Sequence, residues 1–182
     1  MTLNDLMENI PPYARDLKLN FGNLLKQPEL TEQQTWGTVV ATAIASRNQA
    51  LTQAALTEAS NHLSPQALEA AKGAAAIMGM NNVYYRFLHL TKNEAYGTIP
   101  ARLRMQIIRS HGVDQADFEL WCVAVSAINA CGACVDSHEK VIREKGMTEE
   151  TVLAAVRLAS VIHGLAAVLD VERVVPTQPV AA

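Results

Sequence analysis

The sequence has 182 residues, enough for one domain with a substantial buried core. Apolar residues make up 49% of it and aromatic residues only 5%, so the apolar content is mostly small and aliphatic, which favours closely packed helices. The formal net charge of −3 predicts no binding to nucleic acid or to an acidic membrane surface.

Residues 1–21 include early acidic residues and no long apolar run, so we expect neither a signal peptide nor a transit peptide. Apolar runs elsewhere are shorter than the roughly 20 residues that span a bilayer. We therefore expect a cytoplasmic protein that does not enter a membrane. In the reducing cytoplasm a close cysteine pair is more often catalytic or metal-binding than structural.

Four segments show apolar residues at helical spacing, three of them with a capping residue at the start: 30–48 with Thr31, 63–79 with Ser64 and Pro65, 117–129, and 147–169 with Thr148 and Glu150. The only short β-branched run is "VERVV" at 171–175, and we expect the proline-containing segment 174–182 to be extended or frayed. The prediction is an all-α fold.

An internal similarity indicates a duplication. Shifted by 84 residues, the segment 42–78 lies over 126–162 without a gap, with Ala43-Ile44 over Ala127-Ile128. Capping residues and apolar positions agree as well. We predict one domain over 1–175, made of two similar helical halves (about 1–100 and about 101–175), with an extended or disordered tail at 176–182.

This alignment places Cys131, Cys134 and His138 over Arg47, Ala50 and Ala54. The N-terminal half would then have the same arrangement of helices without the cysteines. A cysteine pair that was needed to hold the frame together would be expected in both halves. The comparison therefore argues against a purely structural role.

Three interpretations of the cysteine pair remain. A zinc site would need four ligands, and beyond Cys131, Cys134 and His138 the histidines are scattered singly. A structural disulfide is disfavoured by the compartment and by the small loop it would close. A redox-active dithiol fits best, because residues three apart on a helical turn share one face. A helix that begins at the cysteines would also stabilise a thiolate and lower its pKa below about 8.5.

The all-α setting and several segments resemble the alkyl hydroperoxide reductase D (AhpD) family of the carboxymuconolactone-decarboxylase-like superfamily. These segments include "PPYARDLKLN", "WGTVVATAIASRN", "GAAAIMGMNNVYYR", "FELWCVAVSAINACGAC" and "SHEKVIREKG". The family signature is an acidic residue, eleven intervening residues and then C-x-x-C-x-x-x-H. Glu119, Cys131, Cys134 and His138 meet it. Some members have a histidine between the cysteines, where this chain has Gly132-Ala133.

The resemblance implies an antioxidant peroxidase that also reduces the peroxiredoxin AhpC and assembles as a homotrimer. It implies that Cys134 attacks the alkyl hydroperoxide and becomes a sulfenic acid. Cys131 would be the proton donor and the resolving thiol that closes the disulfide with Cys134. Glu119 would be the general base in a proton relay with His138.

Electrons would come from dihydrolipoyl groups, such as those on a lipoylated 2-oxoacid dehydrogenase component. We expect no bound cofactor and no metal, since the sequence has no glycine-rich nucleotide-binding motif. One alternative is a disulfide carrier or adaptor without peroxidase activity. Another is an enzyme of the carboxymuconolactone-decarboxylase type, which does not need paired cysteines. Cys122, inside an apolar helix, is predicted to be a core residue.

Overall fold

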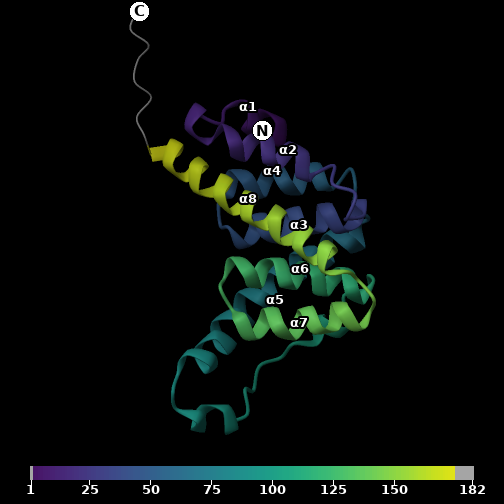
Figure 1. The fold of residues 1–182 in the computed structure, drawn as a ribbon, viewed down its shortest axis with the longest axis vertical. Coiled ribbons are helices and arrows are strands. Elements are labelled where there is room, and N and C mark those ends of the chain that lie inside the picture. The colour runs from purple at the N-terminus through teal and green to yellow at the C-terminus, as the bar shows by residue number, and fades with distance from the viewer. Residues whose placement is uncertain (1, 175–182) are drawn as a thin grey trace, which may run out of the picture.

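A computed structural model describes residues 2–174, and these residues form helices and connecting loops with no β-strand. The all-α prediction is confirmed (Figure 1). The α-helices are α1 (Leu3–Glu8), α2 (Arg15–Leu24), α3 (Glu32–Ala45), α4 (Gln49–Ala59), α5 (Pro65–Leu90), α6 (Gln115–Ile128), α7 (Gly132–Glu144) and α8 (Glu149–Val174). The short 3₁₀ turns are η1 (Pro12–Ala14), η2 (Glu94–Thr98) and η3 (Gln106–Arg109).

The predicted capping residues begin their helices. The Thr31 hydroxyl accepts the Gln34 backbone N–H, and the Gln34 side chain accepts the Thr31 N–H, which together make a capping box. Ser64 accepts the N–H of Ala67 at 3.1 Å, with proline in the first helical position. Thr148 accepts the N–H of the residue three positions later. These bonds satisfy N–H groups that a helix start would otherwise leave unpaired.

Helices α3 and α6 form the centre of the molecule, because they pack against each other and each also contacts α5 and α8 (Figure 1). Gly37 on α3 faces the ring of the fully buried Trp121 on α6. A Cβ atom at Gly37 would lie 2.1 Å from Trp121 Cε2, so only glycine allows this approach. The indole N–H donates to the Gln34 carbonyl oxygen at 3.3 Å. The glycine thus sets how closely the two central helices pack.

The helices α3–α4–α5 recur in the same order as α6–α7–α8. Helices α3 and α6 both have 14 residues, and α5 and α8 both have 26. The starts of the first two pairs differ by 83 residues and those of the third pair by 84. Arg47 and Ala130, which precede the second helix of each set, both have positive φ. Duplication as the origin of this correspondence stays a prediction.

The gap-free shift of 84 residues is therefore wrong by one residue around the cysteines. In the structural register Cys131 corresponds to Asn48, Cys134 to Leu51 and His138 to Ala55. Between the start of its second helix and the start of its third, the C-terminal half has one residue more than the N-terminal half. A gap-free comparison cannot include this extra residue, so it aligns the third helices correctly and the first two helices one residue off. The two tryptophans of the sequence do not correspond, because Trp36 takes the position of Glu119.

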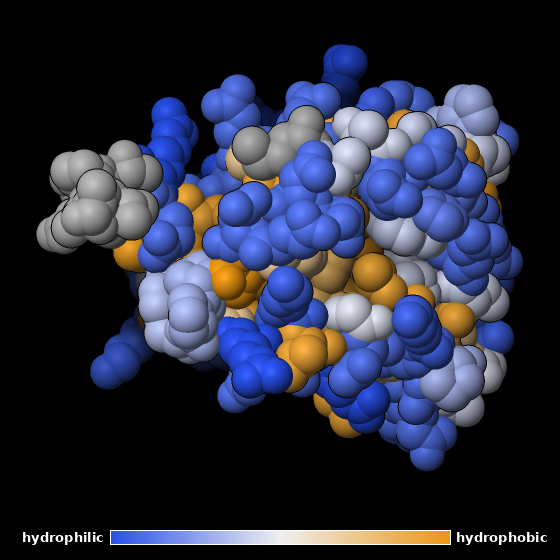
Figure 2. Space-filling view, turned by 90° about the horizontal axis from the view of Figure 1, so that it is seen from above, coloured by the Kyte–Doolittle hydropathy of each residue, from blue (hydrophilic) through white to orange (hydrophobic). Residues whose placement is uncertain are grey.

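The C-terminal part of α5 and the segment that follows it extend away from the bundle (Figure 1). Apolar side chains are exposed there, with Leu90 70% and Ile99 58% accessible. Val83, Phe87 and Tyr96 are exposed in the same region. By contrast, the face seen in Figure 2, at the α1–α2 end, is largely hydrophilic, with apolar side chains mostly in recesses between polar ones.

The "VERVV" run is helical rather than extended as far as Val174, where α8 ends. Val171 and Val174 are exposed, so packing does not explain their conformation; they extend a helix that is already formed, and extension is far easier than starting a helix. The Tyr13 hydroxyl donates to Glu172 at 2.9 Å and ties this last part of α8 to the N-terminal segment. The tail at 176–182 lies outside the described residues.

Helix α8 is the one described helix long and apolar enough to cross a membrane. Its most apolar window is 56% buried inside the bundle. A core helix of a globular protein passes the same test, and α8 packs against α2, α3 and α6. The apolar composition of α8 is therefore accounted for by its place in the core.

Candidate active site

The cysteines lie where the chain turns from α6 into α7. Helix α6 ends at Ile128, and Ala130 has a φ of 53°, in the left-handed region that non-glycine residues rarely adopt. The turn directs the chain back along α6, and Cys131 becomes the N-cap residue of α7. The prediction that a helix begins at the cysteines is confirmed.

Cys131 and Cys134 are joined by a disulfide, with Cα atoms 5.3 Å apart. Cys134 occupies the third position of α7, and its backbone N–H donates to the Cys131 carbonyl at 3.0 Å. The side chain of Cys134 is 4% exposed, and Cys131 is fully buried. The positive end of the α7 dipole therefore points toward both sulfur atoms.

Glu119 and His138 meet across the contact between α6 and α7. The Nδ1 atom of His138 is hydrogen-bonded to Oε2 of Glu119. Glu119 is 3% exposed and His138 9%, so their contact is shielded from solvent. The structure thus brings together the four residues of the signature, although Glu119 is twelve positions before Cys131.

A chain of hydrogen bonds continues from Glu119 to the start of α6. The second carboxylate oxygen, Oε1, accepts from Gln115 Nε2 at 2.5 Å, and Gln115 Oε1 lies 2.9 Å from His111 Nε2. His111 Nδ1 accepts the backbone N–H of Val113. The ring hydrogen of His111 therefore sits on Nε2 and is donated to Gln115. Because the carboxylate accepts from both sides, its orientation toward His138 is fixed.

A cavity of about 380 Å³ opens beside Cys134 and His138. It is lined by residues of α5, α7 and the segment between α5 and α6: Asn81, Tyr85, Met105, Ile108, Ala133, Cys134, Ser137 and His138. Of the two ring nitrogens of His138, only Nδ1 has a hydrogen-bond partner among the described residues. Its other ring nitrogen, Nε2, has no such partner, and His138 is one of the residues that line this cavity.

The sequence did not identify Asn81, Gln115 or His111 as parts of the site. Gln115 follows Asp114, the N-cap residue of α6, where a polar residue needs no functional explanation. Its spacing of four residues from Glu119 was the one available signal, because such residues share a helix face. Asn81 belongs to α5, which only tertiary packing brings against α7.

Cys122 lies in the core, as predicted, and is free and fully buried. Burial raises the pKa of its thiol well above the ordinary value, and the nearby carboxylate of Glu119 raises it further. Such a thiol stays protonated and unreactive. No group of three or more histidine, cysteine, aspartate or glutamate residues arranged to hold a metal ion occurs within residues 2–174.

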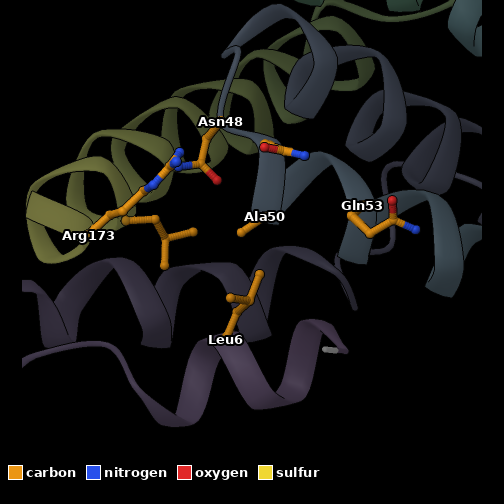
Figure 3. A pocket seen from close by; sticks show the side chains of 7 residues that line it. Leu6, Asn48, Ala50, Gln53 and Arg173 are labelled. Carbon is orange, nitrogen blue, oxygen red and sulfur yellow. The ribbon is translucent and has the colours of Figure 1, made fainter.

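A second cavity, of about 450 Å³, lies at the start of α4, the counterpart of α7 (Figure 3). It is lined by Leu6, Asn48, Gln49, Ala50, Gln53, Leu169 and Arg173. Asn48 stands where α7 has Cys131. It caps α4 through the N–H of Leu51 at 2.8 Å and donates to Asp170 at 2.7 Å. This cavity lies at the position that corresponds to the cysteine site, but it contains no thiol.

Comparison with known proteins relates the whole chain to one family. The Carboxymuconolactone decarboxylase family matches residues 94–175. A protein of Solibacter usitatus named alkyl hydroperoxide reductase AhpD is 64% identical over 172 residues, 94% of this chain and 97% of the relative. The AhpD of Acidobacterium capsulatum is 63% identical over 175 residues, 96% of each chain, and that of Koribacter versatilis 58% identical over 94% of this chain and 89% of the relative.

Identity of this degree extends over nearly the full length of both partners in each comparison. It includes the segment with the cysteine pair, Glu119 and His138, and it reaches beyond the residues matched by the wider family. The chain therefore belongs to the AhpD family.

Proposed function

We propose that this protein is a thiol peroxidase that reduces alkyl hydroperoxides through Cys131 and Cys134. The observation that carries the proposal is the buried Glu119–His138 hydrogen bond beside a cavity that also contains Cys134. Relatives at up to 64% identity bear the name alkyl hydroperoxide reductase. A base, a thiol and a space for substrate therefore occur together, as nucleophilic catalysis requires.

The resemblance makes Glu119 the general base, and we propose that it acts through His138: in the reduced protein His138 Nε2 takes the proton of the Cys134 thiol, and Glu119 stabilises the resulting imidazolium through Nδ1–H. The thiolate attacks the terminal oxygen of the hydroperoxide. A sulfur–oxygen bond forms and the oxygen–oxygen bond breaks, which leaves a sulfenic acid on Cys134. The leaving alkoxide takes the proton of the Cys131 thiol and departs as an alcohol.

The Cys131 thiolate then attacks the sulfenic acid and forms the disulfide. The hydroxide that leaves takes the proton held by His138 and becomes water. One hydroperoxide and two thiols are converted into an alcohol, water and a disulfide. Both sulfurs can take part because the two cysteines lie together at the start of α7, with Cα atoms 5.3 Å apart.

We further propose that a dihydrolipoyl group reopens the disulfide by thiol–disulfide exchange through a mixed disulfide. A lipoylated 2-oxoacid dehydrogenase component would carry this group, and the cyclic lipoyl disulfide would be its oxidised product. The same dithiol of Cys131 and Cys134 would reduce the peroxiredoxin AhpC. The cytoplasm is the compartment in which these partners and a reduced dithiol would meet.

We also propose a homotrimeric assembly. The exposed apolar side chains on the extension of α5, Leu90 and Ile99 among them, support a subunit contact there. A second copy of the chain that covered them would remove apolar surface from water, which favours association.

The test is the consumption of an alkyl hydroperoxide with dihydrolipoamide as reductant, with and without AhpC. Wild type should turn over in both conditions. Cys134→Ser should abolish turnover, and Cys131→Ser should leave a trappable sulfenic acid on Cys134. Cys122→Ala, which removes a thiol outside the cavity, is the matched control. Turnover only with AhpC would indicate a disulfide carrier, and a sulfenic acid on Cys131 would reverse the two roles.

A further inference from the structure

The side-chain amide of Gln115 joins two parts of the site that lie on different segments. Its Nε2 donates one hydrogen to Oε1 of Glu119 at 2.5 Å and the other to the backbone carbonyl oxygen of Ile108 at 3.3 Å. Ile108 belongs to η3 and lines the cavity beside Cys134. A single side chain therefore contacts both the acid of the relay and the backbone of the cavity wall.

The orientation of this amide is determined by its partners. A glutamine side chain has two N–H donors and one acceptor oxygen. The two acceptors, on Glu119 and Ile108, lie at Nε2, and the donor, Nε2 of His111, lies 2.9 Å from Oε1. The reversed amide would face its oxygen toward a carboxylate and a carbonyl. His111 is 7% exposed and stacks on Phe118 with ring centroids 4.2 Å apart, so this donor is itself held in place.

The cavity wall at Ile108 is built on a short segment. The turn η3 covers only Gln106–Arg109, and none of its residues is buried. It lies between α5 and α6, where the structure has two 3₁₀ turns and no α-helix. Hydrogen bonds within such turns have poor geometry. A bond from a side chain of the long helix α6 therefore restricts where Ile108 can lie.

The same helix shows what a structural pair of an amide and an acid looks like. Asp117 on α6 accepts from Gln33 and Gln34 of α3 at 2.7 and 2.8 Å, and this contact joins the two central helices. None of these three residues lines the cavity beside Cys134. Gln115 instead bonds an acid of the site and a residue of the cavity wall, so its partners indicate a role in the reaction.

We propose that Gln115 is a positioning residue that holds the Glu119 carboxylate and the cavity wall at Ile108 in one fixed arrangement. This inference rests on the peroxidase function proposed above. A hydroperoxide whose alkyl group contacts Ile108 is then placed by the same side chain that orients the relay. Because small displacements of reacting groups slow a reaction strongly, a shared support for the wall and the relay favours the reaction.

The bond also determines how strongly Glu119 holds a proton on His138. Glu119 is 3% exposed, and without Gln115 its Oε1 would have no hydrogen-bond partner among the described residues. A buried carboxylate that loses one donor favours positive charge on the partner that remains. His138 would then keep its extra proton to a higher pH and could not accept one from Cys134 at neutral pH.

The experiment measures turnover of two hydroperoxides by wild type and Gln115→Leu, with dihydrolipoamide as reductant, from neutral to alkaline pH. At neutral pH the kcat of Gln115→Leu should be roughly 10- to 100-fold lower with either substrate, as expected for a lost hydrogen bond to a charged group. The difference should narrow as pH rises. KM should rise more for cumene hydroperoxide than for tert-butyl hydroperoxide, because the larger group covers more of the wall.

Gln33→Leu is the matched control, because it removes an amide donor from the other buried acid of α6. Both variants should lower the midpoint of chemical unfolding, but only Gln115→Leu should change the pH profile. The substitution leaves in place the other titratable side chains around the Glu119–His138 pair, which are Tyr85 of α5, Cys122 of α6, Cys134 of α7 and His111.

A pH profile of Gln115→Leu equal to that of wild type, or a loss of the same size at every pH, would overturn the link to Glu119. Equal changes of KM for the two hydroperoxides would overturn the link to the cavity wall. If wild type turns over neither hydroperoxide, the peroxidase function itself fails, and this inference fails with it.

Discussion

Replacing Glu119 with glutamine keeps the size of the side chain but changes how it can bond. Two N–H groups face the carboxylate, one from Gln115 and one from His138. Glutamine has one acceptor oxygen and one NH₂ group, so it cannot accept from both. If the oxygen stays with Gln115, the NH₂ group faces His138 Nδ1. That contact is satisfied only when the ring hydrogen of His138 moves to Nε2.

In that tautomer Nε2 carries a hydrogen and cannot take the proton of Cys134. The substitution therefore removes the general base while all thiols stay in place. A positioned base contributes roughly 10²- to 10⁴-fold to a rate, and we expect peroxide turnover at neutral pH to fall by that factor. Above about pH 8.5 a thiol ionises without help, so the deficit of Glu119→Gln should shrink as pH rises.

The assay is hydroperoxide turnover with dihydrolipoamide, measured from neutral to alkaline pH. Asp117→Asn is the matched control, because Asp117 is also a buried acid of α6 but bonds Gln33 and Gln34 on α3. It should lose stability and keep turnover. Near-normal turnover of Glu119→Gln at neutral pH, or a deficit that does not change with pH, would refute the role of Glu119 in proton transfer.

Three further predictions concern the scaffold. In the oxidised protein, the free energy of unfolding should fall as pH rises above the ordinary thiol pKa, because Cys122 loses its proton in the unfolded chain but keeps it when buried. Denaturation measured at several pH values should show this slope in wild type and a flatter one in Cys122→Ala. Gly37→Ala should destabilise by about 3 kcal/mol through its clash with Trp121, and an unchanged denaturation midpoint would contradict the close approach. Phe87→Glu combined with Leu90→Glu should convert the proposed trimer to a monomer in light scattering, whereas an unchanged mass would place any subunit contact elsewhere.

The helices could be predicted because their signals are local. Thr31 and Ser64 cap the helices they were expected to begin, since capping depends on residues a few positions apart. The start of α7 at the cysteines follows from equally local features. The end of α8 was missed, because the β-branched residues near Val174 disfavour a helix only weakly, and a helix that is already formed extends through them at little cost.

The site was only partly predictable. The spacing of Cys131, Cys134 and His138 is local, but the approach of Glu119 came from family resemblance rather than from any helical periodicity. The place of Asn81 in the lining of the cavity could not be found from the sequence, because it depends on the packing of α5 against α7.

The one-residue correction to the register bears on how easily this chain could acquire a second reactive centre. Copying the site into the N-terminal half would require cysteines at Asn48 and Leu51, a histidine at Ala55 and an acid at Trp36. Each position is already occupied structurally. Asn48 caps α4, Leu51 and Ala55 are almost fully buried, and Trp36 stacks on a histidine ring at 4.2 Å. The N-terminal half could therefore not take on the redox residues without losing the cap of α4 and part of its own packing.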